Sequence, residues 1–240
     1  MSQPKIAILM AAGTGTRLRP ITEKQPKPLV KVNGKPMIET VIEGLMTIPV
    51  ERIIVVTGYL AEQFEYLPKK YSNVTLIHNS EFMEKNNISS IYAAREILGT
   101  ENCIISEADF LVSDSSIFQK EMPHSQYMGK FVEGESDDWS FRMAGNRMTR
   151  ITTGGKAVYN MVGISYWEKE DGKKIVEAVK DAYTKPGHEK LYWDEIVNQL
   201  LSEIYVCVQP VKDGQIVEID TVEELQEIDP SYLDLSHYQK

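Results

Sequence analysis

Short apolar runs separated by helix-like segments organise the first half of the chain. The runs are rich in β-branched residues and too short for buried helices, so they predict buried strands over 6–10, 52–57, 74–78 and 103–106. Apolar residues at helical spacing predict intervening helices over 36–46, 61–67 and 89–98. This alternation predicts a parallel sheet wrapped by helices, with ligands bound at the carboxyl ends of the strands.

The second half changes to a pattern dominated by strands. Alternating or β-rich segments predict strands over 126–133, 139–143, 147–153 and 158–167, with turns at Gly145-Asn146 and Gly154-Gly155. Later segments predict helices over 171–183, 193–201 and 221–228 and strands over 205–209 and 215–219. The sequence therefore predicts one α/β domain over residues 1–230, with a mostly parallel sheet and a smaller β-rich lobe, and a polar tail over 231–240.

The composition narrows the classes of partner. The chain has 240 residues, of which 42% are hydrophobic, which is ample for a sizeable core. Its net charge of −9 argues against nucleic acid or an anionic membrane surface as the main partner, and no apolar run is long enough for membrane insertion. Cys103 and Cys207 stand alone in apolar runs, so we expect core thiols and a cytoplasmic protein. Four scattered histidines give no support to a zinc site or a hydrolase triad: His78, His124, His188 and His237.

The first strand leads into a loop of small residues, 11–16, which is followed by two fixed positive charges. Small side chains let backbone N–H groups approach a ligand, and successive unpaired N–H groups form a concavity for anions. Arg17 follows the loop, and Lys27 stands between two prolines that stiffen its backbone. A P-loop would need Gly-Lys-Ser/Thr, and a dinucleotide fingerprint would need a glycine in place of Leu18 and an acid near Asn33. Neither pattern is present, so the loop predicts a triphosphate site of another kind.

Two far-separated aspartates are candidate metal ligands. Asp109 follows the fourth strand and interrupts apolar surroundings, where an unpaired carboxylate is costly and a metal ion removes that cost. Asp220 stands between a predicted strand and a predicted helix. An aspartate in that position is also an ordinary helix cap, and the residues alone favour the cap for Asp220.

The loop and the lysine together form a signature. The stretch from Gly13 to Thr22 reads G-x-G-T-R-L-x-P-x-T, and Pro26-Lys27-Pro28 follows it. It resembles the signature of the nucleotidyltransferases that activate sugar-1-phosphates and related phosphomonoesters. The resemblance then narrows, over nearly the whole chain, to the bacterial CTP:phosphocholine cytidylyltransferases. The residues that carry it are 86–92, 107–109, Trp139, 161–167, 191–194 and 218–220, and Glu107 stands where that family often has aspartate.

The resemblance implies a Rossmann-like, three-layer (GT-A-like) nucleotidyltransferase fold, with Mg²⁺ held by Asp109 and Asp220. It also implies that Arg17 and the loop amides hold the β- and γ-phosphates of CTP, and that Lys27 stabilises charge around the α-phosphate. The expected nucleotide site is Ala11, Ala12, Gly13, Thr14, Gly15, Thr16, Gly58, Tyr59, Asn86, Asn87, Ser90 and Asp109. Amides such as Asn86 suit either the edge of cytosine or a helix cap, so the choice of CTP over UTP rests on the resemblance alone.

Aromatic residues beside carboxylates are the expected recognition elements for the acceptor. A quaternary ammonium donates no hydrogen bond and is held by aromatic faces and nearby carboxylates. The expected acceptor site is Asp138, Trp139, Lys156, Tyr192, Trp193 and Asp194, with Lys156 on the acceptor phosphate. Structural alternatives exist for these residues: the aromatic ones also suit a core and Lys156 also suits a surface turn. Trp167 ends an apolar strand and is expected in the core.

We therefore expect a Mg²⁺-dependent transferase that makes CDP-choline and pyrophosphate from CTP and phosphocholine by in-line attack on the α-phosphate. A sugar-1-phosphate uridylyl- or thymidylyltransferase is the enzymatic alternative. A non-catalytic nucleotide-binding regulatory subunit is the other, although such proteins usually lose Lys27, Asp109 or Asp220, which are all present here. The sequence leaves open the oligomeric state, a homodimer included, the use of phosphoethanolamine, and whether the chain is part of a larger bifunctional protein.

Overall fold

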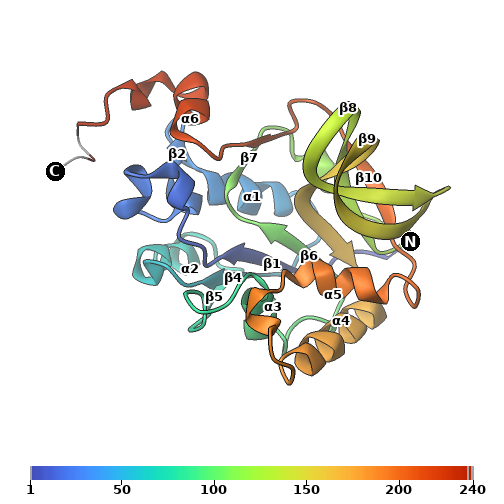
Figure 1. Ribbon diagram of the computed structural model, residues 1–240. Helices are drawn as coiled ribbons and strands as arrows, with labels where there is room; N and C mark the ends of the chain where they lie inside the picture. Colours follow the sequence, from blue (N-terminus) through green and yellow to red (C-terminus); the bar gives the residue numbers. More distant parts are fainter. Residues whose placement is uncertain (1, 237, 239–240) are drawn as a thin grey trace.

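A seven-stranded sheet forms the centre of the molecule (Figure 1). The computed structural model describes residues 2–236 and Tyr238. Along the sheet the strand order is β10-β8-β9-β6-β1-β4-β5. These strands are β1 (Ile6–Ala11), β4 (Arg52–Thr57), β5 (Val74–His78), β6 (Cys103–Glu107), β8 (Gln126–Ala144), β9 (Arg147–Trp167) and β10 (Cys207–Val211). The four strands of the first half pair in parallel, whereas β9 joins β6 antiparallel, so the predicted mostly parallel sheet is confirmed.

Helices cover both faces of this sheet, because successive side chains of a buried strand point to opposite sides. The helices are α1 (Met37–Leu45), α2 (Leu67–Lys70), α3 (Ile88–Ala93), α4 (Lys169–Ala182), α5 (Trp193–Leu200) and α6 (Val222–Ile228). Ala7 of β1 belongs to the core under α1 and α2, and Ile8 belongs to the core under α3, α4 and α5. The resulting helix–sheet–helix arrangement is the predicted three-layer architecture.

A third, smaller core holds the C-terminal segment against the N-terminal loop. Leu18 packs there with Ile219 and Tyr232, all of them buried. The predicted tail therefore begins with a packed 3₁₀ helix, Pro230–Leu233, whereas His237 lies outside the described residues. Two short antiparallel pairs complete the fold: β7 (Phe110–Val112) with β11 (Ile216–Glu218), and β2 (Lys31–Val32) with β3 (Lys35–Pro36). The first of these pairs places the segment after β6 beside the C-terminal part of the chain, at the site described below.

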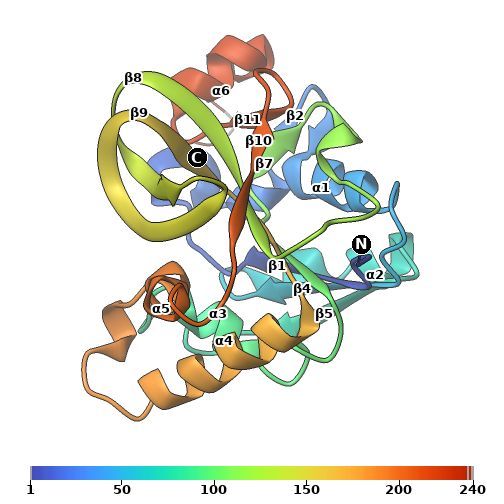
Figure 2. The same ribbon diagram turned by 90° about the vertical axis from the view of Figure 1, so that its right-hand side faces the viewer.

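Strands β8 and β9 extend beyond the sheet as a long curled ribbon (Figure 2). They contain 19 and 21 residues, and register shifts interrupt their pairing, which adds curvature. The predicted turn at Gly145-Asn146 is confirmed as the tip of this hairpin. The predicted turn at Gly154-Gly155 is wrong, because both glycines lie inside β9. Their positive φ angles of 70° and 137° accompany an irregularity in the ribbon rather than a chain reversal.

Local breaks shorten two of the predicted helices. The helix predicted over 61–67 is a 3₁₀ turn, Ala61–Phe64, followed by α2. Pro68 explains the break: it has no N–H to continue a helix but fits the first turn of a new one. The helix predicted over 89–98 ends at Ala93 and continues as turns.

Other predictions about the chain can be checked directly. Both cysteines are free thiols, with Cys103 buried and Cys207 partly buried. Within residues 2–236 and Tyr238, no helix has the length and apolar character needed to cross a membrane.

Candidate active site

The loop after β1 is shaped by Gly15, which adopts a left-handed conformation with φ of 60°. A Cβ at this position would lie 2.8 Å from the Cβ of Lys27, so a side chain would be both strained and obstructed. The hydroxyl of Thr22 donates a hydrogen bond to the Gly15 carbonyl at 2.8 Å and so stabilises this turn. The glycine therefore lets the loop approach the stem of Lys27 closely.

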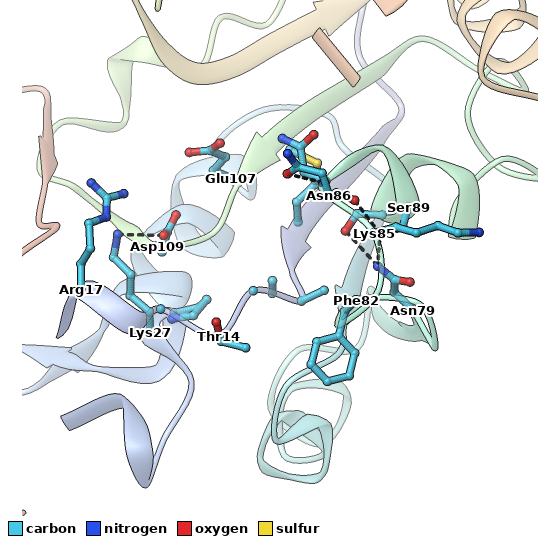
Figure 3. A pocket seen from close by; sticks show the side chains of 18 of the residues that line it. Thr14, Arg17, Lys27, Asn79, Phe82, Lys85, Asn86, Ser89, Glu107 and Asp109 are labelled. Carbon is cyan, nitrogen blue, oxygen red and sulfur yellow. Dashed lines mark hydrogen bonds and ion pairs between the residues drawn. The ribbon is translucent and has the colours of Figure 1, made fainter. Parts of the chain in front are cut away.

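Lys27 and two aspartates meet at one point. Figure 3 shows Lys27 paired with the first of them, Asp109. The buried Lys27 Nζ lies 2.9 Å from Asp109 Oδ2 and 2.7 Å from Asp220 Oδ1. Arg17 Nη1 lies 2.6 Å from the other oxygen of Asp220. Burial lowers the pKa of Lys27, but the two carboxylates outweigh it and hold this pKa above its usual value. The structure therefore has the predicted convergence of two cations, Arg17 and Lys27, with Asp109 and Asp220.

The pairing of β7 with β11 brings Asp220 to Asp109. Glu218 lies opposite Phe110 in that antiparallel pair, so Asp220, which follows β11, comes close to Asp109, which immediately precedes β7. Thr221, not Asp220, caps α6: its hydroxyl accepts from the Glu224 N–H at 3.2 Å, and Glu224 in turn accepts from the Thr221 N–H. The helix-cap interpretation of Asp220 is therefore wrong, and its carboxylate is available to Lys27 and Arg17.

Two cavities adjoin at this cluster. The smaller, of about 340 Å³, follows the loop after β1 from Lys27 towards α3. The larger, of about 850 Å³, lies between the β8–β9 ribbon and the segment that contains β11. Four charged residues line both cavities: Arg17, Glu107, Glu218 and Asp220. The arrangement suits two ligands that bind separately and react where the cavities meet.

Comparison with known proteins identifies the family. Residues 6–143, more than half of the chain, match the model of the family described as nucleotidyl transferase. The chain belongs to this family. The match covers the loop after β1, Lys27 and Asp109, and the remaining part of the chain supplies Asp220.

The similarity to individual relatives extends over more than nine tenths of this nucleotidyltransferase chain. It is 48% identical over 228 residues to 2-aminoethylphosphonate cytidylyltransferase of Lancefieldella rimae, covering 95% of this chain and 93% of that protein. It is 36% identical to choline-phosphate cytidylyltransferase of Streptococcus pneumoniae, covering 93% and 96%. The solved structure of CTP:phosphocholine cytidylyltransferase from Streptococcus pneumoniae superposes with a TM-score of 0.87 at 34% identity, covering 95% of this chain and 99% of that one.

Most of the predicted nucleotide residues line the smaller cavity of the nucleotidyltransferase, namely Ala11, Ala12, Gly13, Thr14, Gly15, Asn86, Asn87, Ser90 and Asp109. Thr16 lines a small adjoining hollow instead. Gly58 and Tyr59 lie behind the loop and do not line the cavity, so their prediction as ligands needs correction. Tyr59 donates its N–H to Ala12 at 3.1 Å and its hydroxyl to the Thr22 carbonyl at 2.9 Å, which supports the loop from behind.

The two asparagines also connect distant parts of the chain. Asn86 donates its backbone N–H to the Glu189 carbonyl at 2.8 Å. The side-chain oxygen of Asn87 accepts the N–H of Trp193 at 2.9 Å, at the first residue of α5. Both residues therefore line the smaller cavity and hold the segment before α5 in place.

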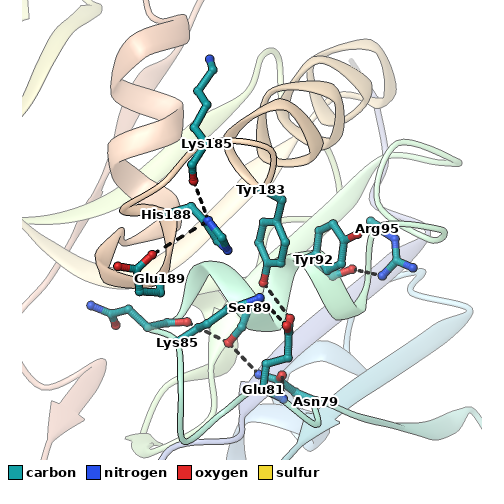
Figure 4. A network of polar contacts seen from close by, with 11 residues as sticks. Asn79, Glu81, Lys85, Ser89, Tyr92, Arg95, Tyr183, Lys185, His188 and Glu189 are labelled. Atoms are coloured by element: carbon teal, nitrogen blue, oxygen red, sulfur yellow. Dashed lines mark hydrogen bonds and ion pairs between the residues drawn. The ribbon is translucent and has the colours of Figure 1, made fainter.

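A polar network supports the same end of the cavity from behind (Figure 4). Lys85 lines the cavity and forms an ion pair with Glu81, which also accepts from the Tyr183 hydroxyl at 3.1 Å. Tyr183 stacks on Tyr92 with ring centroids 3.7 Å apart. Sequence reasoning missed Lys85 and its neighbour Asn79. The only signal was a polar stretch between a strand and a helix.

The predicted acceptor residues separate into two groups. Asp138 and Trp139 line the larger cavity, and the Asn160 amide donates to Asp138 Oδ2 at 2.9 Å. Tyr192 is packed against Trp139, with ring centroids 5.4 Å apart, but it is not part of the cavity lining. Lys156 is exposed opposite Glu135 in the ribbon and lies outside both cavities, so its prediction as a phosphate ligand is not supported by its position.

Trp193 and Asp194 are core residues, which corrects the prediction that they form part of an ammonium cage. Trp193 is 3% exposed and packs against Tyr127 and Trp167. Asp194 is 6% exposed and accepts the Tyr127 hydroxyl at 2.8 Å. The predicted place of Trp167 in the core is confirmed. The first turn of α5 faces the sheet, so its apolar and acidic side chains both point inwards.

Asp194 should make stability depend on pH. Burial raises its pKa to about 7, whereas an unfolded aspartate titrates near ~3.9. The native state therefore keeps a proton that the unfolded state releases, and the associated stability is lost as pH rises from about 4 to 7. Asp194→Asn keeps an acceptor for Tyr127 but cannot ionise. We expect the free energy of unfolding of this variant, relative to wild type, to rise by about 1–4 kcal/mol between pH 4 and pH 8 in urea titrations.

The control for this prediction is Glu177→Gln, an exposed residue of α4. Its free energy of unfolding should stay parallel to that of wild type across the same pH range. Parallel curves for Asp194→Asn as well would show that the Asp194 carboxyl is already ionised in the folded protein at pH 7.

Two further carboxylates, Glu107 and Glu218, were not predicted as site residues. Burial, together with the neighbouring Asp220 and Asp109 and against the effect of Lys27, raises the pKa of Glu218 to about 7. Burial, with Asp109 nearby, also raises the pKa of Glu107. Each glutamate precedes one of the paired aspartates by two residues, and this repeated Glu-x-Asp spacing was the available signal.

The donor set fits a magnesium ion. Carboxylate oxygens are the ligands that Mg²⁺ prefers, and Mg²⁺ usually takes only one or two of them from a protein, with waters and substrate phosphates completing its shell. Among the described residues, no group of three His, Cys, Asp or Glu side chains is arranged to hold a metal by itself. Asp109 and Asp220, which share the Lys27 ammonium, would hold the ion together with a bound nucleotide.

Proposed function

We propose that this protein transfers the cytidylyl group of CTP to a small acceptor that has a phosphonate or phosphate at one end and an ammonium at the other. The acceptor that we propose is 2-aminoethylphosphonate, which the similarity to the cytidylyltransferase of Lancefieldella rimae supports. The observation that carries this proposal is the junction of an N–H-rich cavity with an acidic one at Lys27, Asp109 and Asp220. The relatives named above support cytidylyl transfer over transfer of another nucleotide.

The chemistry at the junction follows from these charges. An oxygen of the acceptor's phosphonate attacks the α-phosphorus of CTP, a new P–O bond forms, and the bond to the β-phosphate breaks to release pyrophosphate. Arg17 and the amides of the loop would hold the β- and γ-phosphates, and Lys27 would stabilise negative charge that grows at the α-phosphate. A bound Mg²⁺ would add charge neutralisation on the triphosphate.

The larger cavity favours a primary ammonium over a trimethylammonium group. Its lining includes six acidic residues whose carboxylates can accept N–H hydrogen bonds: Glu107, Asp137, Asp138, Asp213, Glu218 and Asp220. A quaternary ammonium would instead need several aromatic faces. Of the aromatic residues predicted for a cage, only Trp139 lines the cavity, because Trp193 belongs to the core.

Phosphocholine is the second candidate acceptor. The packing of Tyr192 against Trp139 favours it, because a small movement of Tyr192 would add a second aromatic face. Its use would give CDP-choline.

A pyrophosphate-release assay over a grid of substrates tests the proposal. We expect the highest kcat/KM with CTP and 2-aminoethylphosphonate in the presence of Mg²⁺, at least about tenfold above phosphocholine, phosphoethanolamine and glucose-1-phosphate. Faster reaction of glucose-1-phosphate with UTP or dTTP would favour the sugar-nucleotide alternative. Absence of pyrophosphate with every pair would contradict an enzymatic role.

A further inference from the structure

Glu107 is a carboxylate without a partner at the point where the two cavities meet. It ends β6 and lines both cavities. Within the described part of the chain its side chain has no hydrogen bond or ion pair, because the nearby Lys27 is held by Asp109 and Asp220. The charges around it are mainly acidic, from Asp109, Asp194 and Glu218. A desolvated carboxylate in such surroundings calls for a cation from outside the protein.

The glycine opposite, Gly163, leaves the space that this carboxylate occupies. Gly163 of β9 has a left-handed φ of 72°, and a Cβ added there would lie 2.8 Å from Glu107 Oε2. Any other residue at 163 would therefore be strained and would push the carboxylate away. Gly163 also lines the larger cavity, so the seat of Glu107 is part of the cavity wall.

We propose that Glu107, seated against Gly163, binds the ammonium of the acceptor and determines the preference for a primary ammonium; this inference rests on the proposed function. A primary ammonium offers N–H donors to the carboxylate, whereas a trimethylammonium group offers none. Glu107 lines both the acceptor cavity and the cavity that contains Lys27, which meet where a short acceptor would react.

The test combines a protein change with a substrate change. Glu107→Gln keeps the shape of the side chain and removes its charge. Propylphosphonate keeps the shape of 2-aminoethylphosphonate and replaces its ammonium with a methyl group. We expect Glu107→Gln to raise the KM for 2-aminoethylphosphonate about 10- to 100-fold, the ordinary worth of a hydrogen bond to a charged group. The KM for propylphosphonate should change less than about threefold, and so should the Mg²⁺ concentration for half-maximal activity.

Two further variants sharpen the result. Glu135→Gln is the matched control, because Glu135 is exposed on the ribbon outside both cavities, and it should leave both KM values unchanged. Glu107→Asp withdraws the carboxylate by one methylene and should improve phosphocholine relative to 2-aminoethylphosphonate at least about threefold, because methyl groups gain the space.

The outcomes distinguish the two proposals. If the wild-type enzyme used neither 2-aminoethylphosphonate nor phosphocholine, the proposed function would be overturned. A wild-type enzyme that uses 2-aminoethylphosphonate, with Glu107→Gln affecting both phosphonates equally or neither, would overturn only the role of Glu107. A shift in the Mg²⁺ requirement without a change in the KM for the acceptor would assign Glu107 to the metal instead.

Discussion

Replacing Lys27 with alanine should slow pyrophosphate release about 10²- to 10³-fold at saturating substrates. Its ammonium is buried, 2.9 Å from Asp109 and 2.7 Å from Asp220, so its loss removes the positive charge that these two carboxylates share. The loss should appear in kcat, because the charge that Lys27 stabilises develops as the α-phosphate reacts. The measurement is steady-state turnover with CTP and the acceptor that wild type uses best.

Lys31→Ala provides the matched control, since Lys31 is an exposed residue of β2. It removes the same charge from the same part of the chain and should retain wild-type turnover. Circular dichroism of Lys27→Ala should show a folded protein. A rate within about threefold of wild type would refute the assignment of Lys27 to the α-phosphate.

Asp220→Asn and Thr221→Ala should have opposite consequences. Asp220 contacts Lys27 and Arg17, whereas the adjacent Thr221 caps α6. We therefore expect Asp220→Asn to lower kcat at least about 10²-fold and to raise the Mg²⁺ concentration for half-maximal activity. Thr221→Ala should keep its turnover and lose about 1 kcal/mol of the free energy of unfolding.

Turnover at varied Mg²⁺ and urea unfolding of both variants check this pair of predictions. Each variant serves as the control for the other, because the two residues are neighbours with different partners. The reverse pattern, with an active but unstable Asp220→Asn, would mean that Asp220 is structural and that the metal is held elsewhere.

The sequence predicted the part of the fold that depends on local pattern. Buried runs such as 6–10 match their strands because a continuous apolar run has few other stable places. The ribbon was less predictable: four separate strands were expected where β8 and β9 run on, because bulges and Gly154-Gly155 resemble turns in sequence. The pairing of β8 with β9 shows that each strand continues through these irregularities in the same direction, and local sequence does not reveal that pairing.

Sequence pattern was also an incomplete guide to which side chains form the site. Lys27 and Asp109 could be predicted from their sequence surroundings, whereas Asp220 was assigned through the family resemblance because its position also suits a helix cap. Trp193 could not be placed, because the first turn of a helix faces either the core or a cavity, and only the packing against Tyr127 decides which. Glu107 was passed over for the opposite reason: its significance depends on the space left by Gly163, which is 56 positions further along the chain.

The pairing of β11 with β7 also sets the time at which the enzyme becomes active. A ribosome that has released only the first two hundred residues has already exposed the loop after β1, Lys27 and Asp109. The second aspartate is made later and joins them only when β11 docks. The site is therefore complete only once β11 has paired with β7, and a protease cut between β10 and β11 would separate Asp220 from the segment that carries the loop after β1, Lys27 and Asp109.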